Sequence, residues 1–307
     1  MQTPSSHDLS RWCEQHLGSP AAEQLFAHVH LSAAVGLRLA DGRRVVVKAR
    51  PAAQRLRGCF QVQQHLYSAG FPCPRPLVRP TGLNDLEATA EELVPGGTLL
   101  ADHPDAPELF AAALARLVAA APAVTAVDTL APAPPWIGWD HDDSRPWPWP
   151  DDMDIDLNDL PEPAWLARTA RRVRARLADS DLPDVVGHGD FESQNTRWSG
   201  RELHAVHDWD SAVARPEAAL AGQAAAVFGT TGAPGETTPL PASERFLDAY
   251  ERARGQAWTR EEREVAWAAG LWVLVFNAKK ESAKEANGPE CTHLATEVDE
   301  RLRRARA

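Results

Sequence analysis

Three polar side chains lie at a spacing that suits the transfer of a phosphoryl group. Asn195 follows Asp190 by five positions, and Asp208 follows Asp190 by eighteen. Such a transfer needs a carboxylate that orients the attacking hydroxyl and accepts its proton, and oxygen ligands that hold Mg²⁺ on the phosphates. We therefore assign Asp190 as the catalytic base, and Asn195 and Asp208 as ligands of the metal ion.

The neighbouring sequence predicts the elements that position these side chains. Residues 184–187 form a short apolar run before Asp190, and residues 201–206 form a β-prone run before Asp208. This order predicts a strand, a catalytic loop, a β-hairpin and then an acidic tip. A turn-rich loop with solvated carboxylates is the plain alternative, but two motif pieces in this context favour a catalytic site.

The same residues resemble a known pattern. His188-Gly189-Asp190 with Asn195, followed by Asp208-Trp209-Asp210, is similar to the kinase pattern H-R-D-x-x-x-x-N and D-F-G. With Gly after the His, and with D-W-[DE], the chain resembles the aminoglycoside phosphotransferase family from about residue 45 to residue 227. The resemblance implies an α+β, bilobal, protein-kinase-like fold, with a small β-rich N-terminal lobe and a larger, mainly helical C-terminal lobe.

The resemblance also implies ATP or GTP as phosphate donor, Mg²⁺ as metal ion and a small molecule as acceptor. In such kinases, a lysine at the end of a first-lobe strand reaches the α- and β-phosphates. Residues 35–40 and 43–49 predict a β-hairpin closed by an Asp-Gly turn, and Lys48 lies near its end. Ser32, in a preceding turn that lacks glycine, is assigned to cover the phosphates.

Residues 53–69 predict the helix that, in this family, supplies a Glu to pair with the strand lysine. The expected position of that Glu falls near Cys59, and this helix contains no acidic residue. Gln61 or Gln63 is therefore the candidate to contact Lys48. Without a helix acid, we expect the metal-site aspartate and the phosphates alone to hold this lysine.

Residues 88–97 predict a strand followed by the connection between the lobes. In the family, one backbone carbonyl and one N–H group at this connection bind the nucleotide base. By register, these groups belong to Glu91 and Leu93. The chain is accordingly divided into a nucleotide-binding lobe, a hinge, and a catalytic and substrate-binding lobe at residues 1–92, 93–98 and 99–307.

Residues 122–163 form a long segment rich in Pro, Trp and Asp. So long an insertion is unusual unless it is functional or disordered, and its tryptophans argue against disorder. An acidic, Trp-lined surface suits an amine-bearing acceptor. We therefore assign Asp151, Asp152 and Asp154 to the acceptor site, with Asp210 serving the metal or the acceptor. A packed loop that covers the lobe is equally compatible with this sequence.

The loop that contains Asp190 must be supported by residues other than those that the family uses. The Asp that buttresses this loop in the family is replaced by Ala219, and an unpaired buried donor would cost about 1–3 kcal/mol. Glu217 is the nearest candidate to replace that Asp. His188 is expected to pack and to hydrogen-bond the loop rather than do chemistry. Residues 165–177 predict a helix with five arginines, whose plain interpretation is a solvated face.

Composition limits the class of protein. The 307 residues allow two lobes, and the formal net charge of −11 disfavours nucleic acid as a partner. The longest apolar run, residues 265–276, is shorter than a membrane span requires. The four scattered cysteines predict neither a zinc site nor a disulfide framework. We expect a cytoplasmic protein, without a membrane or nucleic-acid partner, that is a monomer or weak dimer.

The sequence thus predicts a phosphotransferase that modifies a hydroxyl of a small molecule, foremost an aminoglycoside or another sugar-containing antibiotic, and so inactivates it. Two alternatives stay open. A kinase for a metabolic alcohol would share every catalytic residue. A nucleotide-binding protein without turnover would be consistent with the missing helix Glu and the missing glycine loop.

Overall fold

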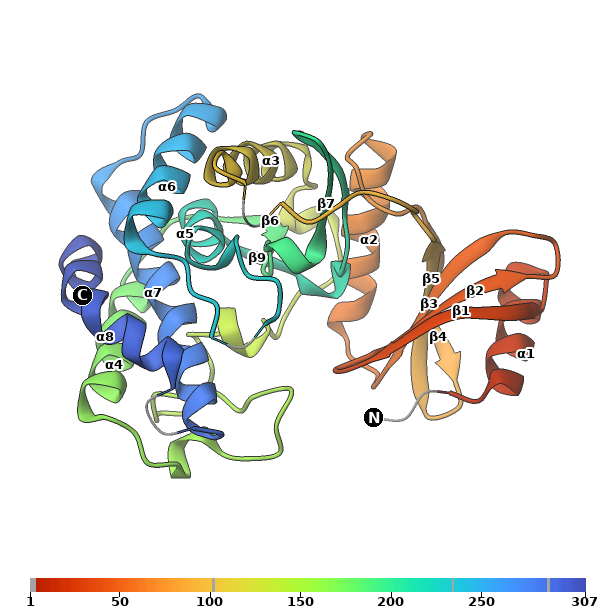
Figure 1. The fold of residues 1–307 in the computed structure, drawn as a ribbon, viewed down its shortest axis with the longest axis horizontal. Coiled ribbons are helices and arrows are strands. Elements are labelled where there is room, and N and C mark those ends of the chain that lie inside the picture. The colour runs from red at the N-terminus through yellow and green to blue at the C-terminus, as the bar shows by residue number, and fades with distance from the viewer. Residues whose placement is uncertain (1–3, 101–102, 234, 286–287) are drawn as a thin grey trace.

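The computed structural model describes residues 4–100, 103–233, 235–285 and 288–307. Figure 1 shows two parts: a sheet-rich part that contains the N-terminus and a larger, mainly helical part that contains the C-terminus. The chain passes between them directly after the fifth strand. This arrangement confirms the predicted α+β, bilobal architecture.

A five-stranded antiparallel sheet with the strand order β1-β2-β3-β5-β4 forms the N-terminal part. Helix α1 (Ser6–Leu17) packs against the sheet, and helix α2 (Arg55–Ser68) lies between the sheet and the helical part (Figure 1). The predicted hairpin and helix are both present. The strands are β1 (Ala21–Val29), β2 (Ala33–Leu39), β3 (Arg44–Arg50), β4 (Pro76–Leu83) and β5 (Leu86–Glu92).

Strand β3 places one lysine on the inner face of this sheet. Successive side chains of a strand point to opposite faces. Val45, Val47 and Ala49 enter the core that includes α1, and each is at most 1% exposed. Lys48 therefore points the other way, toward the helical part, and it is paired across the ladder with Thr89 of β5.

Six α-helices, several short 3-10 helices and two short β-ladders make up the C-terminal part of the described chain. Strand β6 (Asp184–His188) pairs with β9 (Ala212–Pro216), and β7 (Thr196–Ser199) forms a hairpin with β8 (Glu202–Val206). The loops that join these strands carry the motif residues, as the sequence predicted. The helices are α3 (Ala106–Ala120), α4 (Ala164–Ala178), α5 (Glu217–Val227), α6 (Leu240–Arg254), α7 (Arg260–Ser282) and α8 (Pro289–Ala305).

The insertion at residues 122–163 folds against helices α4 and α7. Trp147 is fully buried within it. Arg174 of α4 donates to four backbone carbonyls of the insertion, and the fully buried Lys279 of α7 donates to the Leu160 carbonyl at 2.8 Å. The expectation of a solvated arginine face on α4 is therefore wrong for Arg174, although other arginines of this helix are exposed.

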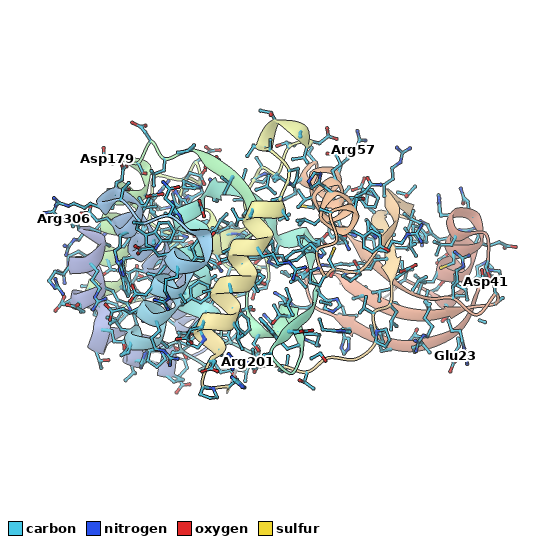
Figure 2. The ribbon with its side chains drawn as sticks, turned by 90° about the horizontal axis from the view of Figure 1, so that it is seen from above. Glu23, Asp41, Arg57, Asp179, Arg201 and Arg306 are labelled. Carbon is cyan, nitrogen blue, oxygen red and sulfur yellow. The ribbon has the colours of Figure 1, made fainter. Side chains whose placement is uncertain are left out.

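Charged side chains cover the outer ends of the molecule. In Figure 2, Glu23 and Asp41 project from the sheet end, whereas Asp179 and Arg306 project from the helical end. None of the described helices is both long enough and apolar enough to cross a membrane. The apolar helix α7 is instead buried against α5, α4 and α8.

Helices α5 and α7 approach closely at two glycines, which gives the first testable prediction. A Cβ at Gly222 would overlap the Ala266 carbonyl, and a Cβ at Gly270 would lie 2.7 Å from the Gly222 carbonyl oxygen. Since neither helix can move without opening the core, Gly222→Ala should destabilise the protein by about 3 kcal/mol. Thermal unfolding measures this, with Gly82→Ala as the control, because a Cβ at Gly82 meets open space. An unchanged Tm for Gly222→Ala would contradict the prediction.

Candidate functional site

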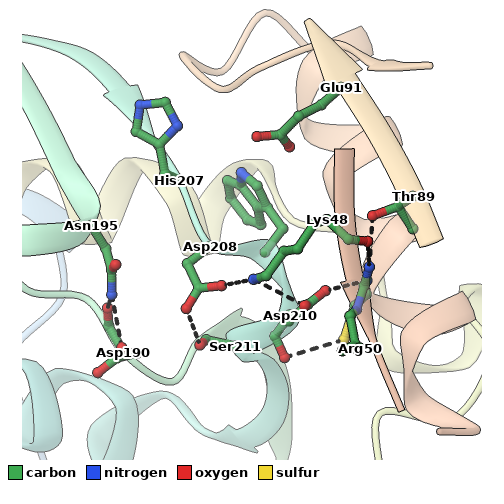
Figure 3. Close-up of polar contacts among 12 residues, drawn as sticks. Lys48, Arg50, Thr89, Glu91, Asp190, Asn195, His207, Asp208, Asp210 and Ser211 are labelled. Carbon is green, nitrogen blue, oxygen red and sulfur yellow. Dashed lines mark hydrogen bonds and ion pairs between the residues drawn. The ribbon is translucent and has the colours of Figure 1, made fainter. Parts of the chain in front are cut away.

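An ion-pair network joins the inner face of the sheet to the loop after β8 (Figure 3). The Lys48 ammonium hydrogen-bonds the Asp208 carboxylate, and its Nζ lies 2.9 Å from an Oδ2 of Asp210. Arg50, two residues further along β3, bonds the other oxygen of Asp210 at 2.6 Å. Two cations of β3 therefore face two carboxylates of the D-W-D segment.

The network shifts the proton affinity of its members. Burial alone would lower the pKa of Lys48, but the neighbouring Asp208 and Asp210 carboxylates outweigh it and raise that pKa. Burial opposes ionisation of Asp208 as well, yet the Lys48 charge lowers the pKa of Asp208 to about 2. Lys48 and Asp208 are consequently both ionised near neutral pH.

Asp208 adopts an unusual backbone conformation that turns its carboxylate toward the sheet. Its φ of 60° and ψ of 52° lie in the left-handed region, which aspartate tolerates better than most residues. The next residue, Trp209, is buried, donates its indole N–H to the Val206 carbonyl at 3.0 Å, and packs edge-on against His188. Trp209 thus anchors the turn that presents Asp208.

The catalytic loop brings Asp190 and Asn195 together. The Asn195 side-chain amide donates to Oδ2 of Asp190 at 2.7 Å and to its backbone carbonyl at 2.9 Å. The backbone carbonyl of Asn195 accepts from the backbone N–H of His207 at 2.8 Å, which places Asn195 beside the turn of Asp208. Burial, followed by the charges of Glu192 and Asp208, raises the pKa of Asp190 well above its ordinary value.

His188 supports this loop through both ring nitrogens. Its Nδ1 accepts the Asp190 N–H at 3.2 Å, so its Nε2 carries the proton and donates to the His207 carbonyl at 3.0 Å. Burial lowers the pKa of His188, which keeps the ring neutral in this bonding pattern. The geometry agrees with the predicted packing role for this histidine.

Other groups replace the buttressing Asp that this chain lacks. The Gly189 N–H donates to the Ser211 carbonyl at 2.7 Å, and the Gly189 carbonyl accepts from the indole of Trp136 at 2.7 Å. Glu217 instead accepts from the hydroxyl of Tyr250 at 3.0 Å. The suggestion that Glu217 supports the loop is therefore wrong. No sequence signal identified Trp136, because its contact spans 53 positions.

The helix that lacks an acid does not supply an amide to Lys48 either. The amide oxygen of Gln61 accepts from the Asp128 N–H at 2.6 Å. The amide group of Gln63 donates to the Glu91 carboxylate at 2.7 Å. Both glutamines thus use their amides elsewhere. The expectation that Asp208 alone would hold Lys48 is also wrong, because Asp210 contacts it.

The hydrogen bonds of strand β5, which precedes the connection between the two parts, differ in register from the prediction. The Leu93 N–H donates to the Arg44 carbonyl at 3.1 Å, so the sheet itself uses the group assigned to the base. Alternate residues of an antiparallel strand bond the same neighbour, and Glu91 therefore pairs with Val46 of β3. Among the described residues, the Val94 N–H, which follows the strand, has no backbone partner.

Glu91 contributes its side chain to the site, which the sequence analysis missed. The carboxylate points from β5 toward the space beside Lys48 (Figure 3). Burial raises the pKa of Glu91 to about 7, although the Gln63 hydrogen bond and the Lys48 charge both lower it. The alternation of apolar Ala88 and Ala90 with Glu91 along β5 was the signal that could have revealed it.

Most acidic residues of the insertion are already paired. Asp152 forms an ion pair with Lys280 at 2.6 Å, and Asp140 pairs with both terminal nitrogens of Arg215. Arg145 holds another group of carboxylates, those of Asp143, Asp156 and Asp159.

Asp151 and Asp154 are exposed, but they differ in their surroundings. Asp151 lies near enough to raise the pKa of Asp190 and to feel the charge of His30 in the β1–β2 turn. Ser32 lies in that same turn, where its carbonyl accepts the His30 N–H at 3.1 Å. Asp151 thus lies within electrostatic range of Asp190 and of the turn that contains Ser32, whereas Asp154 is exposed.

Comparison with known proteins identifies the family. Residues 26–267 match the phosphotransferase enzyme family, APH. The chain belongs to this family. It is therefore a small-molecule kinase with an alcohol group as acceptor. No curated protein matches it.

Solved structures share the fold at low sequence identity. A thermostable mutant of aminoglycoside phosphotransferase APH(4)-Ia, with ADP and hygromycin B, is 15% identical over 98% of this chain and 99% of that chain (TM-score 0.58). Spectinomycin phosphotransferase APH(9)-Ia, with ADP and spectinomycin, is 13% identical over 98% and 100% (TM-score 0.57). Amicoumacin kinase, with AMP-PNP, Ca²⁺ and Ami, is 10% identical over 91% and 87% (TM-score 0.61). The protein-kinase-like fold is thereby confirmed.

The buried Glu91 carboxyl predicts how stability depends on pH. An ordinary Glu has a pKa of 4.5, and folding raises that of Glu91 to about 7. Between these values the folded protein keeps a proton that the unfolded chain has lost, so the free energy of unfolding falls as pH rises. Glu91→Gln should therefore raise Tm at pH 8 by roughly 2–4 °C and leave it unchanged at pH 4.

Thermal unfolding from pH 4 to pH 8 tests this prediction. Glu92→Gln is the matched control, because the adjacent Glu92 is exposed. A Glu91→Gln variant whose Tm differs from wild type by the same amount at both ends of the range would contradict it.

Proposed function

We propose that this chain transfers a phosphoryl group from ATP, or GTP, to a hydroxyl of an amine-bearing antibiotic, foremost an aminoglycoside or a related sugar-containing compound. The contact between Lys48 and Asp208 carries this proposal, because it joins the phosphate-binding lysine of one lobe to the metal-site aspartate of the other. Residues 1–92, 93–98 and 99–307 then serve as nucleotide lobe, hinge and catalytic lobe.

The donors at the proposed metal site suit Mg²⁺. The Asn195 amide nitrogen is bonded to Asp190, which leaves the amide oxygen to act beside the Asp208 carboxylate. Mg²⁺ prefers oxygen ligands and is usually held by one or two carboxylates together with substrate phosphates. When bound, the ion would neutralise charge on the phosphates. Asn195 and Asp208 are the residues proposed to hold it.

Asp190 is proposed as the catalytic base. Its Oδ2 accepts a hydrogen bond from Asn195, so Oδ1 is the oxygen available to take the proton of an acceptor hydroxyl. The His188 ring accepts the Asp190 N–H. This bond holds the Asp190 backbone and therefore the direction of the Asp190 carboxylate. Lys48 donates to the α- and β-phosphates, and the turn of Ser32 covers them.

The base of the nucleotide is proposed to bind one residue further along than the sequence register placed it. The Leu93 N–H belongs to the sheet, so Glu92 would accept from the base through its carbonyl and Val94 would donate through its N–H. Relatives of the same fold were solved with ADP and with AMP-PNP, which favours ATP as donor. The Glu91 carboxyl would lie beside the base at the inner face of β5.

Asp151 is the acid of the insertion that best fits an acceptor site. It is exposed and influences Asp190, whereas Asp152 is neutralised by Lys280. The complexes of two solved relatives contain hygromycin B and spectinomycin. These compounds support an antibiotic acceptor. The proposal therefore retains Asp151, with Asp154 as a secondary charge and with Asp152 held by Lys280.

A kinase for a metabolic alcohol is the second candidate, because it would use the same catalytic residues. A transfer assay with labelled ATP and GTP against hygromycin B, spectinomycin, other aminoglycosides and simple amino alcohols separates the two. Phosphorylation of simple alcohols alone would overturn the antibiotic assignment. Absence of both transfer and Mg²⁺-dependent nucleotide hydrolysis would favour a protein without turnover.

Two isosteric variants separate the proposed roles of the aspartates. Asp208→Asn should abolish transfer and weaken binding of Mg²⁺-AMP-PNP, because a metal ligand loses its charge. Asp190→Asn should leave nucleotide binding intact, yet lower turnover by about 10²-fold or more, since the base contacts the acceptor. Calorimetry and transfer assays measure both effects. Wild-type affinity for Mg²⁺-nucleotide in Asp208→Asn would contradict the metal assignment.

The acceptor charge gives a further prediction. If Asp151 attracts a cationic acceptor, KM for the acceptor should rise with ionic strength while kcat changes little, because salt shortens the range of the attraction. Asp151→Asn should raise KM at low salt by roughly threefold to tenfold and flatten this dependence. Asp142→Asn, an exposed position in the same insertion, is the control. A salt-insensitive KM in the wild type would remove the cationic acceptor.

A further inference from the structure

The face of α2 that would carry a lysine-pairing acid is closed in this chain. Cys59 stands at the position expected for that acid and is 1% exposed. Its Sγ lies 3.6 Å from the Asp210 carbonyl oxygen and 3.7 Å from that of Ala212. A carboxylate at this position would lie against two carbonyl oxygens, which would repel it.

Helix α2 instead binds the backbone of the D-W-D segment. The Arg55 guanidinium donates to the Asp210 carbonyl and, at 2.7 Å, to the Ala212 carbonyl. Together with the Cys59 contacts, these bonds fix the main chain on both sides of residue 211. The carboxylate of Asp210 is thereby directed away from α2 and toward the inner face of β3.

Arg50 holds the Asp210 carboxylate in that direction. It bonds the carboxylate at 2.6 Å, the Thr89 hydroxyl at 2.8 Å and the Lys48 carbonyl at 2.7 Å. Its side chain is only 8% exposed, so these contacts are shielded from water and ions. The remaining oxygen of Asp210 lies 2.9 Å from the Lys48 ammonium.

We propose that Asp210, held by Arg50, is the positioning acid for Lys48 and takes the place of the acid missing from α2. This inference rests on the proposed role of Lys48 in binding phosphates. In the structure, Lys48 contacts both Asp208 and Asp210. Once Asp208 turns to a metal ion, Asp210 remains beside the lysine, because its second oxygen is tied to Arg50.

The charge of Arg50 is essential to this arrangement. Two carboxylates beside a single lysine would leave a net negative site that repels the phosphates of a nucleotide. Arg50 balances the second carboxylate, so the four groups together carry no net charge. Asp210 can therefore orient Lys48 without weakening the attraction of the site for a polyanion.

The competing role for Asp210 is a second metal ligand, and the two roles predict different kinetics. A positioning acid affects turnover but neither the affinity for Mg²⁺ nor its activation midpoint. A metal ligand shifts the Mg²⁺ midpoint, as Asp208→Asn should. The readouts are the rate of Mg²⁺-dependent nucleotide hydrolysis, the Mg²⁺ midpoint of that rate, and the Kd of AMP-PNP with and without Mg²⁺.

Asp210→Asn should lower the hydrolysis rate at least tenfold, the effect of losing one hydrogen bond to a charged group. The Kd of AMP-PNP and the Mg²⁺ midpoint should each stay within about threefold of wild type. Asp210→Glu keeps the charge and should recover part of the rate. Asp140→Asn, which removes an arginine–carboxylate pair that does not involve Lys48, should lower Tm without changing the rate.

Arg50→Gln tests whether Arg50 acts through Asp210. The double variant Arg50→Gln/Asp210→Asn should be no slower than Asp210→Asn alone, because residues that act together give non-additive effects. Fully additive losses would overturn the role of Arg50.

A wild-type hydrolysis rate in Asp210→Asn, or a tenfold shift of its Mg²⁺ midpoint, would overturn the role of Asp210. A crystal structure with AMP-PNP and Mg²⁺ in which Asp210 binds the metal would do the same. Failure of the wild type itself to bind AMP-PNP or GMP-PNP would instead overturn the proposed function. The two failures are therefore distinguishable.

Discussion

The contact between the Lys48 ammonium and the Asp208 carboxylate is the interaction on which the rest of the site depends. It joins the sheet to the helical part of the molecule (Figure 3). Opposite charges in a half-buried setting attract more strongly than at an open surface, because less water screens them. The contact thus sets the distance between the surface that would hold phosphates and the loop that carries Asp190.

Two local features of the backbone make this contact available. In β3, the core takes Val47 and Ala49, so alternation forces Lys48 to the inner face. After β8, the left-handed conformation of Asp208 turns its carboxylate back toward the sheet, and the buried Trp209 keeps the turn in place. A change of one residue in either register would separate the charges, which explains why the spacing of the motif is informative.

The sequence was sufficient to predict the fold class, the hairpin of β2 and β3, helix α2, and the grouping of Asp190 with Asn195. These features follow from local pattern and motif spacing. It was insufficient for partners that lie far apart in the chain. The Arg50–Asp210 pair spans 160 positions, and nothing in local sequence indicates it. The predicted register at Leu93 also differs from the structure, because a shift of one residue along a strand moves a backbone group to the other side of the strand.

The acid that contacts Lys48 lies on a loop in this chain, and not on helix α2, for an electrostatic reason. Lys48 responds to the distance and burial of a carboxylate, whichever element carries it. Because Cys59 packs α2 against the backbone carbonyl of Asp210, a carboxylate on this face of the helix would meet a carbonyl oxygen that repels it. The loop is then the element that can place a carboxylate beside Lys48, and Arg50 becomes necessary to balance it. The acid-free helix α2, the Asp210 carboxylate and Arg50 of β3 thus form one linked arrangement around Lys48.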